Sequence, residues 1–338
     1  MRCFVGYSTA YFNYKIDKVN GVGLRLSVMS APNKLSARAN SELYLTGFTD
    51  EAADELSRQI AVCRHLGWSR IDLRTVDGGN IVEIPDTEFD EVCKKLAEAG
   101  LEVSSFGSRI ANWSRRVDDD PDADYRLLEA AIPRMHRLGV KYIRIMSYRP
   151  DSAAGLSAAE LERRVVERVR TLAKMAEAGG VICLHENCDT WGGQSHEHTL
   201  RLLDAVGSEH LKLVFDTGNP FATLDVRGEV PYRFQDTWEF YERVKPHIAY
   251  LHIKDGVVAD GQVVYTFPGE GNAEVPRILA DLAASGYQGP ISIEPHLAVV
   301  YHDPSVTAGS EERWDSFVAY AKRTGRLLEQ AGFELTTP

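Results

Sequence analysis

The sequence lacks the features that would assign it to a membrane, to secretion or to nucleic acid. No run of about 18 consecutive apolar residues occurs, so we expect no transmembrane helix. The first residues, MRCFVGYSTAYFNYKIDKVNG, contain no compact apolar stretch of the kind found in secretory signals. The formal net charge is −11, which disfavours general binding to phosphate backbones. These absences predict a cytoplasmic protein that acts neither on membranes nor on nucleic acid.

Cysteine is scarce, and its spacing argues against the common thiol sites. The number of cysteines is odd and no CxxC pair is present, so neither a disulfide framework nor a zinc knuckle is expected. We interpret the thiols as reduced and mostly buried as small apolar side chains. The five cysteines are Cys3, Cys63, Cys93, Cys183 and Cys188.

The chain also lacks a glycine-rich dinucleotide motif at its first expected β–α turn, which leaves a Rossmann sheet with little support. Instead, from residue 43 onward, a short apolar run repeatedly precedes an amphipathic helix. Parallel strands joined by helical crossovers produce this pattern. The unit occurs eight times, with strands expected at residues 43–48, 69–76, 101–108, 141–147, 181–187, 211–219, 247–255 and 290–296, and helices at 50–67, 86–100, 122–139, 157–180, 196–207, 236–245, 273–286 and 310–332.

Eight strand–helix units are the number that closes a (β/α)8 TIM barrel. We therefore predict an α/β fold with one catalytic barrel domain at residues 43–333, a span of the usual size for this fold. Residues 1–42 are rich in Ser, Asn and Lys and have weak periodicity. We expect them to form an N-terminal extension or arm.

Four consecutive strands of the predicted barrel end in a side chain that can bind a metal ion. Glu186 lies in LHEN, Asp216 in VFDTGN, His252 in LHIKD and Glu294 in SIEPH. Taken singly, such a carboxylate is commonly a helix cap or solvated, and a lone buried histidine is commonly a hydrogen-bonded core residue. In a barrel, however, these strand ends meet at one rim, where crowded carboxylates repel unless a cation lies between them. We therefore predict that all four residues bind one divalent metal ion.

The types of ligand limit the choice of ion. Three carboxylates and one imidazole suit Mn²⁺, Mg²⁺, Co²⁺ or Zn²⁺, and we expect Mn²⁺. No cysteine is among the four ligands, which argues against a structural zinc site.

The motifs around these four residues resemble a known family. HEN, FDTGN, LHIKD and ISIEP, with FPGEGNAEVPRILADLAASGYQGP before the last, resemble the xylose isomerase-like sugar isomerase/epimerase barrels, which include ketose 3-epimerases and inosose dehydratases. The resemblance covers about residues 43–333 and is strongest after residue 181. It implies that the four strand-end residues bind one metal ion and that Glu186 and Glu294 also act as acid and base.

Two positions depart from many ketose 3-epimerases. Asn219 stands where those proteins place a histidine, three residues after the aspartate, and no arginine follows the histidine of the seventh strand in GVVADG. Both positions usually contact substrate in that family. Membership of the family is therefore better supported than the epimerase activity itself.

The resemblance and the ligands together imply a metal-dependent isomerase or epimerase of a keto sugar or polyol. The metal ion would polarise the carbonyl and stabilise the enediolate formed when a carboxylate removes the α-proton. Return of a proton by a second carboxylate gives epimerisation. Loss of a β-substituent would instead make the protein a lyase or dehydratase, acting on a keto sugar, an inosose or an oxidised glycoside. The expected partner is a small carbohydrate; its phosphorylation, and assembly into a homo-oligomer, stay open.

Two other classes of protein are disfavoured. Endonuclease IV shares the barrel but adds several histidines at strand ends, whereas the first four strands here end in GFTDE, DLRTV, SFGSR and IMSYR. A non-catalytic sugar-binding protein would have no need of the complete ligand set.

Polar residues next to the ligands are candidates for binding substrate. Lys254 follows His252 by two positions and therefore points to the same side of the strand, although a structural ion pair would explain it equally well. His296 stands in the same relation to Glu294. Asn187 could orient a ligand, and Asn219 lies at a position that contacts substrate in the family.

Three residues in long loops complete the predicted substrate site. Trp113 and Trp191 follow the third and fifth strands, where an aromatic ring can stack on a sugar, although burial under the loop is the alternative. Arg109 shares the loop of Trp113 and could bind an anionic group.

Overall fold

Parallel strands form the centre of the described structure. The computed structural model describes residues 43–152, 154–300 and 303–334. Within them, eight parallel strands form one sheet in the order β1 (Leu45–Gly47), β12 (Ile291–Ile293), β9 (Ile248–Ile253), β8 (Leu211–Asp216), β7 (Ile182–Glu186), β6 (Tyr142–Ile145), β5 (Glu102–Gly107) and β2 (Arg70–Leu73). A parallel bridge between Phe48 and Asp72 lies where β1 meets β2, so the sheet nearly closes. The predicted (β/α)8 TIM barrel is thus confirmed.

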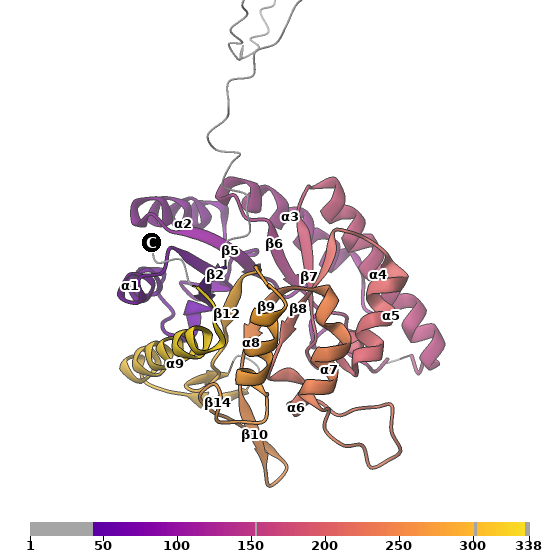
Figure 1. The fold of residues 1–338 in the computed structure, drawn as a ribbon. Coiled ribbons are helices and arrows are strands. Elements are labelled where there is room, and N and C mark those ends of the chain that lie inside the picture. Colours follow the sequence, from indigo (N-terminus) through magenta and orange to yellow (C-terminus); the bar gives the residue numbers. More distant parts are fainter. Residues whose placement is uncertain (1–42, 153, 301–302, 335–338) are drawn as a thin grey trace, which may run out of the picture. The chain divides into compact units, whose positions relative to one another are not determined.

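Helices alternate with the strands along the chain and surround the sheet (Figure 1). They begin and end close to the predicted positions because each amphipathic segment is followed by a stop signal. Gly67, Gly100, Gly139 and Gly207, for example, adopt left-handed conformations immediately after four of the helices. The helices are α1 (Leu56–Leu66), α2 (Asp86–Ala99), α3 (Asp122–Leu138), α4 (Ala158–Ala178), α5 (His196–Val206), α6 (Asn219–Ala222), α7 (Thr237–Val244), α8 (Val275–Ala284) and α9 (Ser310–Ala331).

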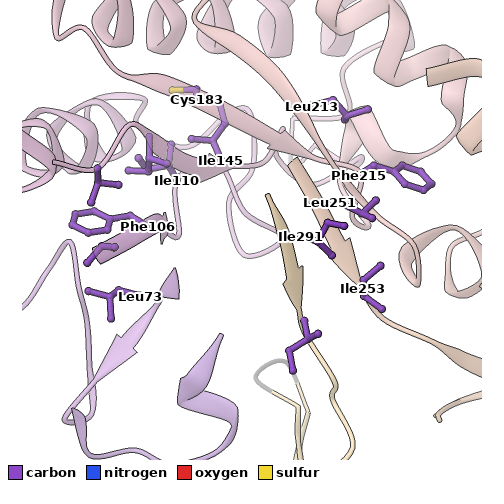
Figure 2. Packing of buried hydrophobic residues seen from close by; sticks show 14 of the residues in the cluster. Leu73, Phe106, Ile110, Ile145, Cys183, Leu213, Phe215, Leu251, Ile253 and Ile291 are labelled. Carbon is purple, nitrogen blue, oxygen red and sulfur yellow. The ribbon is translucent and has the colours of Figure 1, made fainter. Parts of the chain in front are cut away.

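The two faces of the barrel strands differ in chemistry. Outward-facing side chains such as Leu213, Phe215, Leu251 and Ile253 are buried with helix residues in one large apolar cluster, and Figure 2 shows these four on the same side of β8 and β9. Successive side chains of a strand point to opposite faces, so the residues between them point into the barrel. There, Leu184, Val214 and Tyr250 form a separate small cluster. The large cluster stabilises the barrel and leaves its interior for polar groups.

Two features differ from the expectations. The sequence predicts a helix from residue 50, but α1 begins at Leu56 and Thr49–Glu51 forms a 3₁₀ turn, because Asp50 and Glu51 are buried in ion pairs with Arg74. In addition, three short hairpins follow barrel strands. They are β3 (Thr75–Val76) with β4 (Gly79–Asn80), β10 (Gly256–Ala259) with β11 (Gln262–Tyr265), and β13 (Val299–Val300) with β14 (Asp303–Thr307).

Two further predictions concern the N-terminal segment and membrane-spanning helices. The predicted N-terminal extension, residues 1–42, lies outside the described residues. In the described part of the chain, no helix has the length and apolar character needed to cross a bilayer.

Candidate metal centre

The barrel brings the four predicted ligands to the ends of four neighbouring strands. Glu186 is the last residue of β7, Asp216 is the last of β8, and His252 is the fifth of the six residues of β9. The register pairs Asp216 directly with His252. Glu294 follows β12 and extends the pairing through its N–H, which donates to the carbonyl of Ile253 at 3.1 Å. Four segments that are far apart in sequence therefore deliver their side chains to one place.

The four side chains point into the barrel and converge. One ligand atom from each residue lies within 4.8 Å of the ligand atoms of the others. His252 Nδ1 is 3.5 Å from Glu186 Oε1 and 3.9 Å from Glu294 Oε2. All four residues are at most 3% exposed. Three carboxylates at this spacing, shielded from water, require compensating positive charge.

In Asp216 and Glu294, one carboxylate oxygen accepts hydrogen bonds and the other does not. Asp216 Oδ1 accepts the N–H groups of Gly218 and Asn219, both at 2.8 Å, whereas Asp216 Oδ2 is buried and accepts no hydrogen bond. Glu294 Oε1 accepts from Arg74 at 2.5 Å, and its Oε2 accepts none. The buried atoms Glu186 Oε2 and His252 Nδ1 also lack a hydrogen bond among the described residues. These oxygens face buried cations, Lys254 for Asp216 and Glu294 and Arg144 for Glu186. Three carboxylates and one imidazole are a donor set that suits a divalent metal ion.

Buried cations surround the cluster. Lys254 Nζ lies 3.0 Å from Asp216 Oδ2 and 3.3 Å from Glu294 Oε2. Arg144 Nη1 lies 3.2 Å from Glu186 Oε2. These positive charges offset part of the carboxylate charge, so the site is not strongly anionic before a metal ion binds.

The two glutamates are held ionised by their neighbours. Burial raises the pKa of Glu186, but Arg144 and His252 together more than offset burial, and the pKa falls to about 2. Burial likewise raises the pKa of Glu294, but Lys254 above all lowers it well below its usual range. Both groups are therefore carboxylates at neutral pH, the form that a metal ligand or a base requires.

Asp216 and His252 shift in the opposite direction. Burial raises the pKa of Asp216 to about 6, with repulsion from Glu294 added and attraction to Lys254 opposing it. Burial lowers the pKa of His252, but the adjacent Glu186 carboxylate raises it above its usual value. The surrounding carboxylates thus favour the protonated form of His252, whereas a metal ligand requires the neutral imidazole.

The two predicted asparagines contact the ligands. Asn187 Nδ2 donates to the carbonyl of Asp216 at 3.0 Å, and Asn187 Oδ1 accepts the N–H of Asp216 at 2.7 Å. This side chain orients Asp216 and does not line the cavity described below. Asn219 Nδ2 lies 3.5 Å from Glu186 Oε1, and Asn219 Oδ1 accepts from Lys254 Nζ at 3.3 Å. Asn219 also lines the cavity, so substrate can reach it.

His296 lies beside the cluster in a strained backbone conformation. Its φ is +55°, and its N–H donates to Glu51 Oε2 at 2.7 Å. Its Nδ1 is 3.0 Å from Glu51 Oε1. Glu51, Glu294 and His296 form a second group whose ligand atoms lie within 4.8 Å of one another, although Glu51 is occupied by these bonds. His296 lines the cavity, as a substrate-binding residue must.

A cavity of about 1530 Å³ opens over the carboxylate–histidine cluster. Its lining includes Glu186, Glu294 and Lys254 at the inner end and Trp113 and Arg109 nearer the surface. The cluster is therefore accessible to a small molecule although each ligand is buried.

The loop residues predicted to contact substrate have different positions. Trp113 is 38% exposed and lines the cavity. Arg109 lines it as well but is bound by Glu83, with Nη2 to Oε2 at 2.6 Å. Trp191 is 3% exposed, packs edge-on against His198, and is not among the residues that line the cavity. The structure thus places Trp191 in the core beneath its loop, where it begins a short, buried 3₁₀ turn at Trp191–Gly193.

Three residues of the site are not predicted from the sequence. Arg74 follows β2 and binds Asp50, Glu51 and Glu294, and Arg144 lies within β6. A charged residue inside an apolar strand, as in KYIRIMS, is the signal that could have identified Arg144. Glu51 carries no such signal, because it lies in a segment whose composition is that of a helix start.

Fold and site together define a (β/α)8 barrel with a buried carboxylate–histidine cluster at the carboxyl ends of its strands. A family model described as xylose isomerase-like TIM barrel matches residues 60–315. The chain belongs to this family. No curated protein matches the chain.

Solved structures with the same fold differ widely in sequence. The IOLI protein with a binding zinc atom has a TM-score of 0.64 at 17% identity, covering 86% of this chain and 100% of that one. D-psicose 3-epimerase with D-tagatose, from Clostridium cellulolyticum H10, has a TM-score of 0.61 at 17% identity, covering 84% and 99%. The probable 3-DHS dehydratase AsbF from Bacillus anthracis has 0.60 at 16% identity, covering 82% and 97%. At these identities the likeness establishes the fold alone.

Proposed function

We propose that the protein is a divalent-metal-dependent isomerase or epimerase of a keto sugar or related polyol. The observation that carries the proposal is that Glu186, Asp216, His252 and Glu294, all buried, bring one donor atom each within 4.8 Å of one another beside the inner end of a cavity. Family membership supports it, since solved barrels of this fold include an epimerase and a zinc-binding protein.

We propose Mn²⁺ as the ion, because hard oxygen ligands dominate the set and one imidazole is tolerated. When bound, the ion supplies Lewis-acid polarisation of a carbonyl, which acidifies the neighbouring C–H bond. The remaining chemistry belongs to the side chains. Asp216 and His252 are held as ligands, the former by Asn187 and by two backbone N–H groups.

Glu186 and Glu294 are the proposed acid and base. Both are ionised in the folded protein, so either can accept the α-proton. Glu294 Oε1 is bound by Arg74, so a proton on this residue resides on Oε2, which faces the cluster. Epimerisation requires one glutamate to remove the proton and the other to return one to the opposite face of the carbon.

Residues at the inner end of the cavity would hold the substrate. Lys254, Asn219 and His296 offer a buried ammonium, an amide and an imidazole next to the ligands. Sugar hydroxyls both donate and accept hydrogen bonds, so such a mixed set suits them. Trp113 offers a ring face nearer the surface. Arg109 contributes less, because Glu83 neutralises it.

Elimination is the second candidate reaction, because it shares the first step. Once the α-proton has been removed, loss of a hydroxyl or another β-substituent makes the protein a dehydratase or lyase. A probable dehydratase has the same fold. The two outcomes differ in products and are separated by one experiment.

The experiment is solvent exchange. Metal-stripped protein is reloaded with Mn²⁺ and incubated with a panel of keto sugars and keto polyols in D₂O, and the recovered material is analysed by NMR and mass spectrometry. Deuterium at the α-carbon with inversion supports epimerisation, whereas an unsaturated product with loss of a substituent supports elimination. Absence of both across the panel contradicts the proposal.

Variants assign the exchange to the site. Glu186→Gln and Glu294→Gln each remove a carboxylate and should slow exchange by about 10²–10⁴-fold. Glu209→Gln is the matched control, because Glu209 is 91% exposed and pairs with Lys212 at the surface. Full activity in either of the first two variants would contradict the assigned roles.

A further inference from the structure

We propose that the cavity takes a substrate of two parts: a keto sugar or polyol at the inner end, and an uncharged apolar group, such as an aromatic ring, attached to it at the mouth. This inference rests on the proposed function for its inner half. The outer half follows from the size, lining and charge of the cavity.

The cavity is larger than a free sugar needs. Its volume is about 1530 Å³, whereas sites for drug-sized ligands commonly measure about 300–1,000 Å³. A hexose is smaller than such ligands, so with its carbonyl at the metal centre it would leave most of the cavity to water. A substrate with a second part can fill the remaining volume.

The chemistry of the lining changes along the cavity. The charged residues at the inner end, including Glu186, Lys254 and Glu294, are at most 4% exposed. Toward the surface the lining includes Trp113, which is 38% exposed, and Val264, which is 48% exposed. Large apolar side chains that stay exposed at a cavity mouth commonly mark a surface that binds an apolar group.

Loop elements outside the barrel build this apolar mouth. The β10–β11 hairpin supplies Val263 and Val264, and the β13–β14 hairpin supplies Val300 and Val306. Tyr265, at the end of β11, packs edge-on against His296 with ring centroids 5.0 Å apart. The hairpin wall is thereby joined to the inner end of the cavity, so one ligand can contact both.

The charges near the mouth argue against a phosphate or carboxylate as the outer group. Among the described lining residues, Arg109 is the cation nearest the surface, and its guanidinium binds Glu83 at 2.6 Å. Glu88 and Asp189 add negative charge to the same lining. An anionic substituent would meet repulsion there, whereas a neutral ring would meet Trp113 and the valines.

Binding of paired ligands tests the inference directly. Isothermal titration calorimetry compares the phenyl and methyl glycosides of the same 3-keto hexose, in which the ketone is not part of the glycosidic bond, and the 6-phosphate of the methyl glycoside, on Mn²⁺-loaded protein. We expect the phenyl glycoside to bind at least about tenfold more tightly than the methyl glycoside. A phenyl glycoside that binds no more tightly, including the case in which neither binds, or a phosphate that binds more tightly than both, would overturn the inference.

Variants test whether residues at the cavity mouth cause the tighter binding of the phenyl glycoside. Trp113→Ala and Val264→Thr should each reduce the phenyl-over-methyl preference by about threefold to tenfold, and Val264→Thr should leave the affinity for the methyl glycoside unchanged. Tyr232→Ala and Val230→Thr are the matched controls, since Tyr232 is 38% exposed, Val230 is 79% exposed, and neither lines the cavity. A preference that survives both mouth variants contradicts the placement of the ring.

Failure of this inference can be distinguished from failure of the proposed function. Solvent exchange on free keto sugars without a phenyl preference would leave the reaction standing and remove the outer subsite. A phenyl preference that depends on Trp113, without any exchange, would leave the subsite standing and remove the reaction.

Discussion

Single residues define the candidate metal centre through the way they divide their polar atoms. Asp216 uses one carboxylate oxygen to bind two backbone N–H groups and leaves the other facing the cluster. Glu294 gives one oxygen to Arg74 in the same way. This arrangement fixes each carboxylate before a metal ion arrives, so less side-chain entropy is lost when the ion binds.

Lys254 is predicted to weaken metal binding while it supports the reaction. Its ammonium is 3.0 Å from Asp216 Oδ2 and repels a divalent cation at that oxygen. Lys254→Met should therefore lower the Kd for Mn²⁺ by at least about tenfold and also lower turnover. Calorimetric titration measures the first effect, with Lys212→Met on the surface as control. Weaker metal binding in Lys254→Met would instead mean that the ammonium holds the ligands in place.

Arg74 is predicted to be essential to the stability of the metal-free protein. It is 7% exposed and compensates the buried carboxylates of Asp50, Glu51 and Glu294. Arg74→Leu removes this charge and should lower the free energy of unfolding by about 3–5 kcal/mol in urea titrations. Arg58→Leu, which breaks the exposed pair with Glu311, should have a much smaller effect. Equal effects of the two variants would show that the buried charges are compensated elsewhere.

At the level of elements, the loop after β9 is organised by a single carboxylate. Asp255 Oδ1 accepts the N–H groups of Gly256 at 2.8 Å and Ala273 at 3.0 Å. Its Oδ2 accepts those of Gly269 at 2.7 Å and Gly271 at 3.2 Å. The end of β9 thus has two functions: His252 and Lys254 face the carboxylate cluster, and Asp255 holds the segment that leads into α8.

Asp255→Ala is predicted to disorder this segment. Four buried or partly buried N–H groups lose their acceptor, so the free energy of unfolding should fall by about 3 kcal/mol or more. Asp255→Asn keeps one acceptor oxygen, so its free energy of unfolding should lie between those of Asp255→Ala and the wild type. Asp315→Ala, on the exposed face of α9, should change the free energy of unfolding little. Urea titration provides the comparison. A stable Asp255→Ala would mean that water replaces the carboxylate.

Elements differ in how well the sequence predicts them. Barrel strands and helices are predictable because each has an apolar face that must be buried, and this produces a period. The β10–β11 hairpin also had a signal: Asp260 and Gly261, both with positive φ, form the turn in VVADGQVV. The burial of Trp191 had no sequence signal. It depends on a close approach of the loop backbone to Cys188, which is possible because residue 193 is glycine.

At the level of the whole molecule, the barrel explains why the convergence of Glu186, Asp216, His252 and Glu294 was predictable and the contacts of Arg74 and Arg144 with them were not. The ligands share one sequence feature, a polar residue at the end of an apolar strand, and the closed sheet turns that feature into proximity. Arg144 reaches the same cluster with its long side chain from β6, which pairs with β7, and Arg74 reaches it from the end of β2, with β1 between β2 and β12. Contacts across the interior depend on the tilt and closure of the sheet, which no local pattern reports.

The central claim is that the ends of β7, β8, β9 and β12 bind one divalent metal ion. Calorimetric titration of metal-stripped protein with Mn²⁺, alongside Asp216→Asn and His252→Gln, tests it most directly. The account predicts one ion per chain in the wild type and at least about a hundredfold weaker binding in each variant, with circular dichroism spectra unchanged. Binding of equal stoichiometry and affinity in both variants, or no binding in the wild type, would contradict it.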